Sequence, residues 1–356
     1  MPPLLVNNLY VSNFNAKANA FNIFFADQCS SIDTGSEIPA ELEQITNEIL
    51  YDINFTSVDI LNIINNLNVN KAHGHDNISI RIIKIFGKTI CKPLELIFRN
   101  SLAVGKFPQI WKKANVIPIH KKNEKNLLKN YRPISLLPIC SKIFERLIFN
   151  SIYNYISKNN LLSSNQSGFR PGDSCTNQLL SITHHIHSSF DDYSSLETRG
   201  VFLDMSKAFD KVWHEGLIHK LQTFGITGKL LSLLKDFLSN RSQRVALNSQ
   251  FSKWKDVKAG VPRGAILDPL LFLIYINDLS NNLKSTVKLF ADDVSFFSIV
   301  HDPNLSAAEL NSDLRKINNW AHKWRMSFNP DPLKQATEVI FSKKRNIVNH
   351  PDLYFN

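Results

Sequence analysis

Residues 199–203 read RGVFL, an apolar run that is typical of a β-strand, and Asp204 follows it directly. Residues 287–298 read VKLFADDVSFFS, which contains two further β-type runs on either side of Ala291, Asp292 and Asp293. This pattern predicts a hairpin with an acidic pair at its tip. If the hairpin lies beside the strand that ends at Asp204, three carboxylates meet at one end of a sheet.

Three carboxylates beside apolar strands need a compensating charge, because burying each ion costs several kcal/mol. Mg²⁺ supplies such a charge, since it prefers hard oxygen ligands and is commonly held by one or two carboxylates together with substrate phosphates. Two metal ions about 3.5–4 Å apart would lower the pKa of an attacking hydroxyl and neutralise a leaving pyrophosphate. An isolated Asp-Asp pair is most often an ordinary turn, so the metal interpretation depends on the rest of the chain.

Helical and extended segments alternate irregularly around these strands. Residues 56–59 (TSVD) predict a capping box before an amphipathic helix, and residues 140–156 carry one apolar helical face. Residues 217–238 predict a helix broken at its two glycines, whereas the pattern of residues 269–279 leaves helix and strand open. Residues 1–55 predict a loosely ordered lead-in with helical pieces. Few strands among many helices favour an α+β fold.

Composition excludes several classes of protein. The chain has 356 residues, of which 43% are hydrophobic, enough to build a sizeable core. Its four cysteines lie far apart without a CxxC pair, which excludes a zinc ribbon and a disulfide-dense scaffold and favours a reducing compartment. We see no signal peptide and no membrane span, because the longest apolar run, residues 270–276, is far shorter than about 20 residues. We therefore expect an intracellular protein of the nucleus or cytoplasm, without a membrane partner.

The net charge of +10 is unevenly distributed along the chain. Between Trp111 and Lys129 a single acid, Glu124, accompanies six lysines: Lys112, Lys113, Lys121, Lys122, Lys125 and Lys129. Such cations bind nucleic acid by releasing counterions from its phosphates. A solvated lysine-rich surface explains the same run, so the charge permits a nucleic-acid partner without establishing one.

Eight motifs stand in a fixed order between residues 71 and 344: KAHGHDNIS, NVIPIHKKN, NYRPISLLP, NQSGFRPGDSC, FLDMSKAFDKVWH, GVPRGAILDPLLFLIYINDL, LFADDV and MSFNPDPLKQATEVIFSKK. In these motifs the chain resembles the reverse transcriptase of non-LTR (LINE-type) retrotransposons. FADD alone is weak, but FLDMSKAFD, GVPRG and FADD in this order after YRPISL are highly specific. The resemblance implies a right-hand polymerase with fingers, a palm built on an antiparallel sheet, and a helical thumb.

The resemblance further implies RNA-templated DNA synthesis from deoxynucleoside triphosphates, in which a primer 3′-hydroxyl attacks the α-phosphate. Its partners would be an RNA template, a DNA primer and the nucleotides, and its cofactors two Mg²⁺ ions, with Mn²⁺ as a substitute. The residues that match the catalytic and metal-binding positions are Asp204, Asp292 and Asp293. The residues that match template-contacting positions are Gln166, Gly168, Phe169 and Arg170.

Six residues match positions that bind the incoming nucleotide: Lys121, Arg132, Phe209, Arg263, Gly264 and Lys334. Lys121 and Arg132 would cover the triphosphate, Arg through its bidentate fork and Lys through its compact charge. The ring of Phe209 would collide with a ribose 2′-hydroxyl and so select deoxyribose. Pro262, Arg263 and Gly264 would support template and nucleotide, and Lys334 would be a general acid for the pyrophosphate. For Asp210 we expect a structural hydrogen-bonding role.

Three residues depart from the family pattern. Arg263 stands where glutamine is usual, Ala265 where a small hydroxyl residue is usual, and Asp268 where glycine is usual. Arg263 would bring a cation beside the nascent base pair. Asp268 would force a side chain into a backbone conformation that glycine adopts easily. These departures favour, as an alternative, an inactive remnant that retains the fold and at most binds RNA.

Three segments are expected along the chain: a mostly helical N-terminal extension (residues 1–110), the reverse transcriptase domain with fingers and palm (residues 111–345), and a truncated tail (residues 346–356). We expect most of the thumb to be missing and any endonuclease to come from elsewhere, as in a truncated or decayed retrotransposon copy. A metal-dependent nuclease would also use clustered carboxylates, but it leaves YRPISL and GVPRG unexplained.

Overall fold

The computed structural model describes residues 1–30, 37–38, 43–192, 194–195, 197–329, 331, 335–344 and 348–355. Over these residues the chain forms two compact units, each assembled from several segments. Unit 1 contains the described residues within 1–31, 39–161 and 209–271, and unit 2 contains those within 32–38, 162–208 and 272–356. Helices and mainly antiparallel sheets occur in both, which confirms the predicted α+β class. The three segments predicted along the chain stay a prediction, because packing groups the residues by contact and not by chain order.

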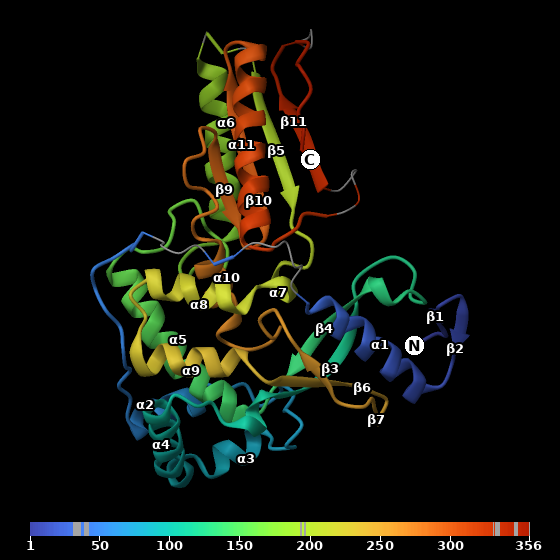
Figure 1. Cartoon of the computed structure of the whole chain (residues 1–356), viewed down its shortest axis with the longest axis vertical. Helices are drawn as coiled ribbons and strands as arrows, with labels where there is room; N and C mark the ends of the chain where they lie inside the picture. Colours follow the sequence, from blue (N-terminus) through green and yellow to red (C-terminus); the bar gives the residue numbers. More distant parts are fainter. Residues whose placement is uncertain are drawn as a thin grey trace. The chain divides into compact units, whose positions relative to one another are not determined.

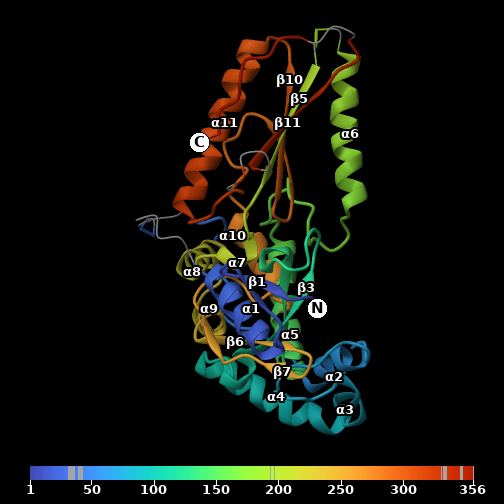
Figure 2. The same ribbon diagram turned by 90° about the vertical axis from the view of Figure 1, so that its right-hand side faces the viewer.

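Unit 2 is built on a four-stranded antiparallel sheet in the order β11-β5-β10-β9. Its strands are β5 (Glu197–Asp204), β9 (Thr286–Phe290), β10 (Asp293–Val300) and β11 (Ala336–Phe341). Helices α6 (Cys175–Asp191) and α11 (Pro303–Lys323) lie on opposite sides of these strands (Figure 2). Because both faces are covered, β5 and β10 are buried along almost their whole length, including the polar residues Glu197, Thr198 and Arg199 at the start of β5.

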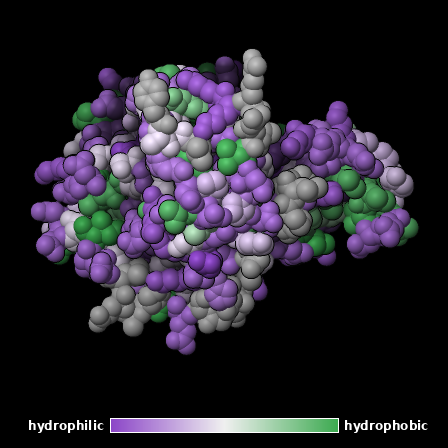
Figure 3. Space-filling model, turned by 90° about the horizontal axis from the view of Figure 1, so that it is seen from above, coloured by the Kyte–Doolittle hydropathy of each residue, from purple (hydrophilic) through white to green (hydrophobic). Residues whose placement is uncertain are grey.

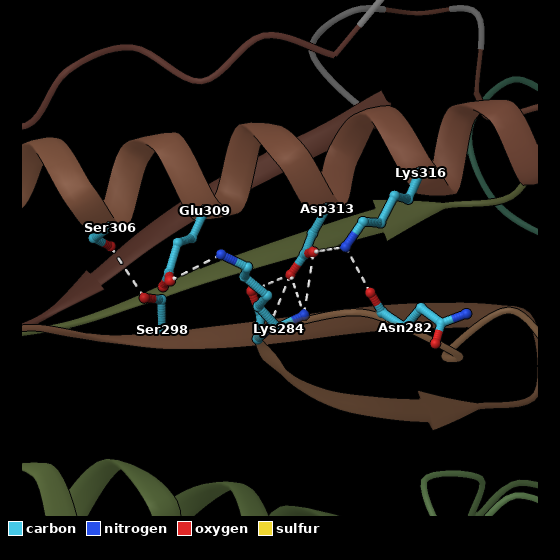
Figure 4. Close-up of polar contacts among 8 residues, drawn as sticks. Asn282, Lys284, Ser298, Ser306, Glu309, Asp313 and Lys316 are labelled. Carbon is cyan, nitrogen blue, oxygen red and sulfur yellow. Dashed lines mark hydrogen bonds and ion pairs between the residues drawn. The ribbon is translucent and has the colours of Figure 1, made fainter.

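A buried carboxylate fastens α11 to the loop before β9 (Figure 4). Asp313 is fully buried and accepts hydrogen bonds from the backbone nitrogens of Lys284 (3.0 Å) and Ser285 (2.9 Å). Lys316, one turn along the helix, lies 3.4 Å from the same carboxylate and also donates to the carbonyl of Asn282. These contacts satisfy a buried charge and fix the helix against the sheet.

Unit 1 contains a five-stranded sheet in which β4-β3-β6-β7 are neighbours and β8 also pairs with β6. The strands are β3 (Lys113–His120), β4 (Tyr131–Leu136), β6 (Arg241–Leu247), β7 (Gln250–Phe251) and β8 (Lys255–Val257). Only β3 and β6 run parallel among the described strands of this sheet. The helices of unit 1 are α1 (Phe14–Gln28), α2 (Ser57–Asn65), α3 (Ile80–Ile85), α4 (Gly87–Val104), α5 (Ile139–Lys158), α8 (His214–Thr223) and α9 (Gly228–Leu238) (Figure 1).

The first 30 residues are more ordered than the sequence predicts. Strands β1 (Leu4–Val6) and β2 (Leu9–Val11) form a hairpin whose turn residues, Asn7 and Asn8, both have positive φ. Asn tolerates this conformation better than most residues, and such a two-residue turn suits a hairpin. Helix α1 then places Phe21 and Phe25 in the core of unit 1. The expectation of helical pieces is confirmed, and that of a loosely ordered lead-in is wrong for these residues.

The other elements largely follow the predicted pattern. Thr56 caps α2 in a complete capping box, in which Asp59 accepts a hydrogen bond from the Thr56 backbone nitrogen (2.8 Å). Helices α8 and α9 are separated at the two glycines, as predicted. The ambiguous run after residue 267 is a helix, α10 (Asp268–Ile276).

The molecular surface is largely polar on the face drawn in Figure 3, where hydrophobic residues form small separate patches. Among the described residues no helix is both long enough and apolar enough to cross a membrane.

Candidate active site

The predicted carboxylates meet at one end of the sheet in unit 2. Asp204 is the last residue of β5, Asp293 is the first residue of β10, and the two are direct partners in the antiparallel register. Directly paired residues in such strands have Cα atoms about 4.5–5.5 Å apart. The two-residue turn that joins β9 to β10 consists of Ala291 and Asp292, and Asp293 follows it directly. Three acidic residues from two distant parts of the sequence are therefore neighbours in space.

The chemistry of these donors fits Mg²⁺, because all three present carboxylate oxygens at the ends of adjacent strands. Asp204 and Asp293 are exposed and Asp292 is half-buried. In the described part of the chain, no three or more His, Cys, Asp or Glu side chains are gathered tightly enough to hold a metal ion. The backbone thus brings the carboxylates together, while their side chains do not point at one centre.

Asn329 is a neighbour of Asp204 that the sequence analysis missed. Its side-chain nitrogen donates to Asp204 Oδ2 (2.7 Å) and its backbone nitrogen donates to the Asp204 carbonyl (2.8 Å). Two residues after Asp204, the Ser206 backbone nitrogen donates to the carbonyl of Ser327 (2.8 Å), so the same two segments are joined a second time. Asn329 therefore fixes the position of one carboxylate oxygen of Asp204, Oδ2. The motif MSFNPD was the available signal, but nothing local ties it to Asp204.

The hairpin tip that carries Asp292 is held by a glutamine from another segment. Ala291 has a φ of +54°, a left-handed conformation that costs a non-glycine residue roughly 1–2 kcal/mol. Gln166 Oε1 accepts hydrogen bonds from the backbone nitrogens of Ala291 (2.9 Å) and Gly168 (2.8 Å). A Cβ atom on Gly168 would lie only 2.2 Å from the Ala291 nitrogen, so this close approach requires glycine.

The predicted template-contacting residues differ in what their side chains do. Gln166 is buried and its amide is occupied by the hairpin. Arg170 donates to the carbonyls of Ser163 (3.1 Å) and Gln166 (3.3 Å), which braces the same loop. Phe169 is 51% exposed and has a φ of +56°. Template contact by these residues stays a prediction, and Phe169 is the most exposed of the four.

In unit 1, Phe209, Asp210 and Arg263 form one cluster. The guanidinium of Arg263 donates to both carboxylate oxygens of Asp210, at 3.0 and 2.8 Å, and lies 5.9 Å from the centre of the Phe209 ring. The Val261 backbone nitrogen donates to the carbonyl of Phe209 (2.9 Å), which joins the two segments. The predicted structural role of Asp210 is confirmed, and the cation at position 263 has a buried carboxylate as its partner.

Gly264 and Asp268 have different backbone requirements. Gly264 has a φ of +114°, and a Cβ atom there would lie 2.6 Å from the Ser135 carbonyl oxygen, so glycine is required. Asp268 has no positive φ and begins α10, where its carboxylate accepts a hydrogen bond from the Ala265 backbone nitrogen (3.1 Å). The expectation that Asp268 occupies a glycine conformation is therefore wrong.

A buried acidic pair supports the loop that follows Gly264. Glu145 on α5 accepts hydrogen bonds from the backbone nitrogen of Ile266 and from the hydroxyl of Ser141, both at 2.7 Å. Burial raises the pKa of Glu145, and burial followed by the charge of Glu145 raises the pKa of Asp268 well above its usual range. Arg241, also buried, opposes both shifts. Two carboxyl groups thus hold the backbone of residues 265–266.

Lys121 and Arg132 lie near each other at one end of the β3–β4 pair. Arg132 is the register partner of Ile119, and the Lys121 backbone nitrogen donates to the Asn130 carbonyl (2.8 Å). The two-residue period of extended chain puts both exposed cations on one face. Lys112, in contrast, is buried in an ion pair with Asp236 and is not part of a solvated lysine surface. Lys334 lies outside the described residues.

Comparison with known proteins agrees with these features. Residues 119–345 match the family model for reverse transcriptase (RNA-dependent DNA polymerase). The chain is 33% identical over 281 residues to the probable RNA-directed DNA polymerase from transposon BS of Drosophila melanogaster, covering 76% of this chain and 31% of that protein. From the same organism, the polymerase from mobile element jockey is 27% identical, covering 92% of this chain and 36% of that protein.

A third relative, the probable polymerase from transposon X-element of Drosophila melanogaster, is 32% identical over 82% of this chain and 32% of its own length. The chain thus spans about a third of the length of the curated relatives it matches. The expectation drawn from its motifs is confirmed: the chain belongs to the reverse transcriptase family, in the group of the non-LTR, LINE-type retrotransposons.

Proposed function

We propose that this chain is an RNA-directed DNA polymerase that extends a DNA primer on an RNA template with deoxynucleoside triphosphates. The observation that carries the proposal is the pairing of Asp204 with Asp293 across β5 and β10, with Asp292 in the adjoining turn. In this proposal the β11-β5-β10-β9 sheet is the palm, and the β3–β4 pair belongs to the fingers.

Asp204 and Asp292 would hold two Mg²⁺ ions, with Asp293 as the supporting carboxylate. When bound, Mg²⁺ lowers the pKa of an attacking hydroxyl and stabilises negative charge on phosphate oxygens. Asn329 fixes the orientation of Asp204 through its hydrogen bond to Oδ2. Gln166 keeps the strained turn at Ala291 in the conformation that presents Asp292. Preorganisation of this kind spares the site a rearrangement during the reaction.

Recognition of the nucleotide would fall to residues of unit 1. The exposed cations Lys121 and Arg132 would bind the triphosphate, which suits their charge. Phe209 would exclude a ribose 2′-hydroxyl, and its ring position is supported by Arg263 and by the Val261 hydrogen bond. Gly264 lets the backbone after Arg263 pass close to β4. Lys334 would donate a proton to the leaving pyrophosphate.

The proposal is tested by primer extension with purified protein, an RNA template, an annealed DNA primer, Mg²⁺ and nucleotides. We expect Asp292→Asn to lower the extension rate by roughly two orders of magnitude or more, because the variant would lose a carboxylate ligand of the Mg²⁺ ions that stabilise negative charge in the transition state. Asp256→Asn is the matched control: Asp256 is exposed on β8 and is outside the proposed site, so we expect its variant to retain the wild-type rate.

Extension that persists in a folded Asp292→Asn protein would remove Asp292 from the site. If the wild-type protein binds RNA yet extends no primer with Mg²⁺ or Mn²⁺, the inactive-remnant alternative replaces the proposal. Strand cleavage in the absence of nucleotides would instead indicate a metal-dependent nuclease.

A further inference from the structure

A polar groove in unit 1 is lined almost entirely by residues outside the proposed polymerase site, with Gly264 as the exception. It has a volume of about 820 Å³ and runs between α2 and α5, which lie beside each other in Figure 1. One stripe of α5 lines it from Ile139 to Asn154, a length of about 22 Å at the usual helical rise. Gly264 and Ile266 also line the groove, so it reaches the loop that we propose supports template and nucleotide.

The charge of the groove is positive. Three cations line it, Lys71, Lys142 and Arg146, against one acid, Asp59. Asp59 is engaged in the capping box of α2, where it accepts two hydrogen bonds from Thr56. The three cations form no ion pair with any part of the chain that the structure describes. An anion is therefore the missing partner of this surface.

The surroundings of Lys142 favour a bound anion most clearly. Burial lowers the pKa of its ammonium group, and the nearby charge of Lys71 lowers it further, against the opposing effect of Glu145. Gly74 explains why Lys71 lies so near: its loop passes against the start of α5, and a Cβ there would be 2.4 Å from the Pro138 nitrogen. A bound phosphate would relieve the repulsion between the two lysines.

Most of the remaining polar lining consists of amides. Asn62 of α2 and Asn66, which caps the end of that helix, line the groove together with Asn150 and Asn154 of α5. Amide side chains both donate and accept, so they suit the edges of unpaired bases and ribose hydroxyls. A row of cations that follows a backbone, accompanied by such groups, is a feature of single-strand binding channels.

We infer that this groove binds the single-stranded part of the template RNA, ahead of the site where it is copied. The inference rests on the proposed polymerase function, and it adds a contact surface to which, among the proposed site residues, only Gly264 contributes. At a stacked spacing of about 3.4 Å per nucleotide, the 22 Å stripe along α5 accommodates roughly six nucleotides.

The test measures binding of labelled primer–template duplexes whose template 5′ extension is zero, three, six or twelve nucleotides, without nucleotides present and over a range of salt. We expect affinity to rise up to about six nucleotides and then to level off. Lys142→Ala/Arg146→Ala should weaken binding of the six-nucleotide extension about tenfold and lower the salt slope by roughly 1.4, which corresponds to two single-strand phosphates. Binding of the blunt duplex should not change.

Arg81→Ala/Lys88→Ala is the matched control, because it removes two exposed cations of unit 1 that lie outside the groove. It should bind like the wild type, and thermal melting should show both variants folded. The inference is overturned by an affinity that ignores extension length, by an equal loss on the blunt duplex, or by an equal loss in the control. An RNA extension should bind at least as tightly as DNA, and tighter binding of DNA would overturn the assignment to the template.

This experiment needs no catalysis, so its outcome is separate from that of primer extension. Length-dependent binding without extension would leave the groove assigned and contradict the proposed activity. Extension without length-dependent binding would contradict only the groove.

Discussion

Arg263 occupies a position where the family usually has glutamine, and its partner explains how the chain tolerates the cation. Asp210 is almost fully buried, and both of its oxygens accept hydrogen bonds from Arg263. A bidentate pair of this kind is stronger than a single hydrogen bond. The departure at position 263 is thus compensated by a residue 53 positions earlier in the chain.

At this scale we predict that restoring the family residue alone destabilises the protein. Arg263→Gln leaves the Asp210 carboxylate buried without its counter-charge, which should lower the free energy of unfolding by about 1–3 kcal/mol, less than for a fully buried pair because Arg263 is partly exposed. Adding Asp210→Asn should recover most of the loss. Urea denaturation of both variants checks this, and equal stability of the Arg263→Gln and wild-type proteins would contradict it.

The sequence predicted single residues well where their role is set by a motif, and poorly where it is set by a distant partner. Asp204, Asp292 and Asp293 follow from apolar runs that end in acids, and the register brings them together. Asn329 is 125 residues from Asp204, and Gln166 is 125 residues from Ala291. Local pattern carries no information about such contacts, so neither hydrogen bond was predicted.

Among elements, the start of α10 depends on α5 and β6. Asp268 accepts from Ala265, Glu145 accepts from Ile266, and Arg241 supplies a positive charge nearby. One oxygen of Asp268, Oδ1, is buried with no hydrogen-bond partner in the described part of the chain. A protonated Asp268 suits this arrangement, because a second buried negative charge beside Glu145 would be costly.

This arrangement predicts a pH dependence. The pKa of Asp268 is raised in the folded state by burial and by Glu145, so above the ordinary Asp pKa the folded protein retains a proton that the unfolded chain has released. The stability from this group is therefore complete below that ordinary value and is lost as the pH rises towards the folded pKa. Asp268→Asn should flatten the fall in unfolding free energy as the pH rises above the ordinary Asp pKa, by up to about 1.4 kcal/mol per pH unit.

Urea denaturation at several pH values measures this slope. Asp256→Asn removes an exposed carboxylate and should leave the slope as it is in the wild type. If Asp268→Asn shows the wild-type slope, the retained proton belongs elsewhere and the explanation is wrong.

Local sequence patterns predicted some of the helices and strands and failed for others. The capping box at Thr56, the strand before Asp204 and the hairpin around Asp292 were all predicted from local patterns. The run that became α10 was left open because nearly every residue in it is apolar, and a segment buried on all sides shows no period. Strands β1 and β2 have three residues each, too short for alternation to be recognised.

For the whole molecule, chain order is a poor guide to packing. The N-terminal helices from α1 to α4 belong to the same compact unit as β3, α5 and β6. The chain leaves this unit after residue 161, returns at residue 209 and leaves again after residue 271. A contact pattern of this kind depends on long-range burial, which one sequence read in order does not reveal.

The four thiols give a test of the molecule's packing. The exposed Cys175, in unit 2, and the half-buried Cys29 lie where a reagent reaches them, whereas Cys91 and Cys140 are buried in unit 1. Burial raises the pKa of Cys91, and it raises the pKa of Cys140 to about 11, so burial disfavours the reactive thiolate at both positions.

We therefore predict that iodoacetamide at pH 8 modifies Cys175 first and Cys29 more slowly, while Cys91 and Cys140 react only when unit 1 opens. Mass spectrometry of the native protein should show two modified thiols, and four after denaturation in guanidinium chloride. A Cys175→Ser variant controls for the fast site and should show one fewer modified thiol in each state. Because Cys91 lies on α4 and Cys140 on α5, modification of either as fast as Cys175 would mean that these helices do not pack as described.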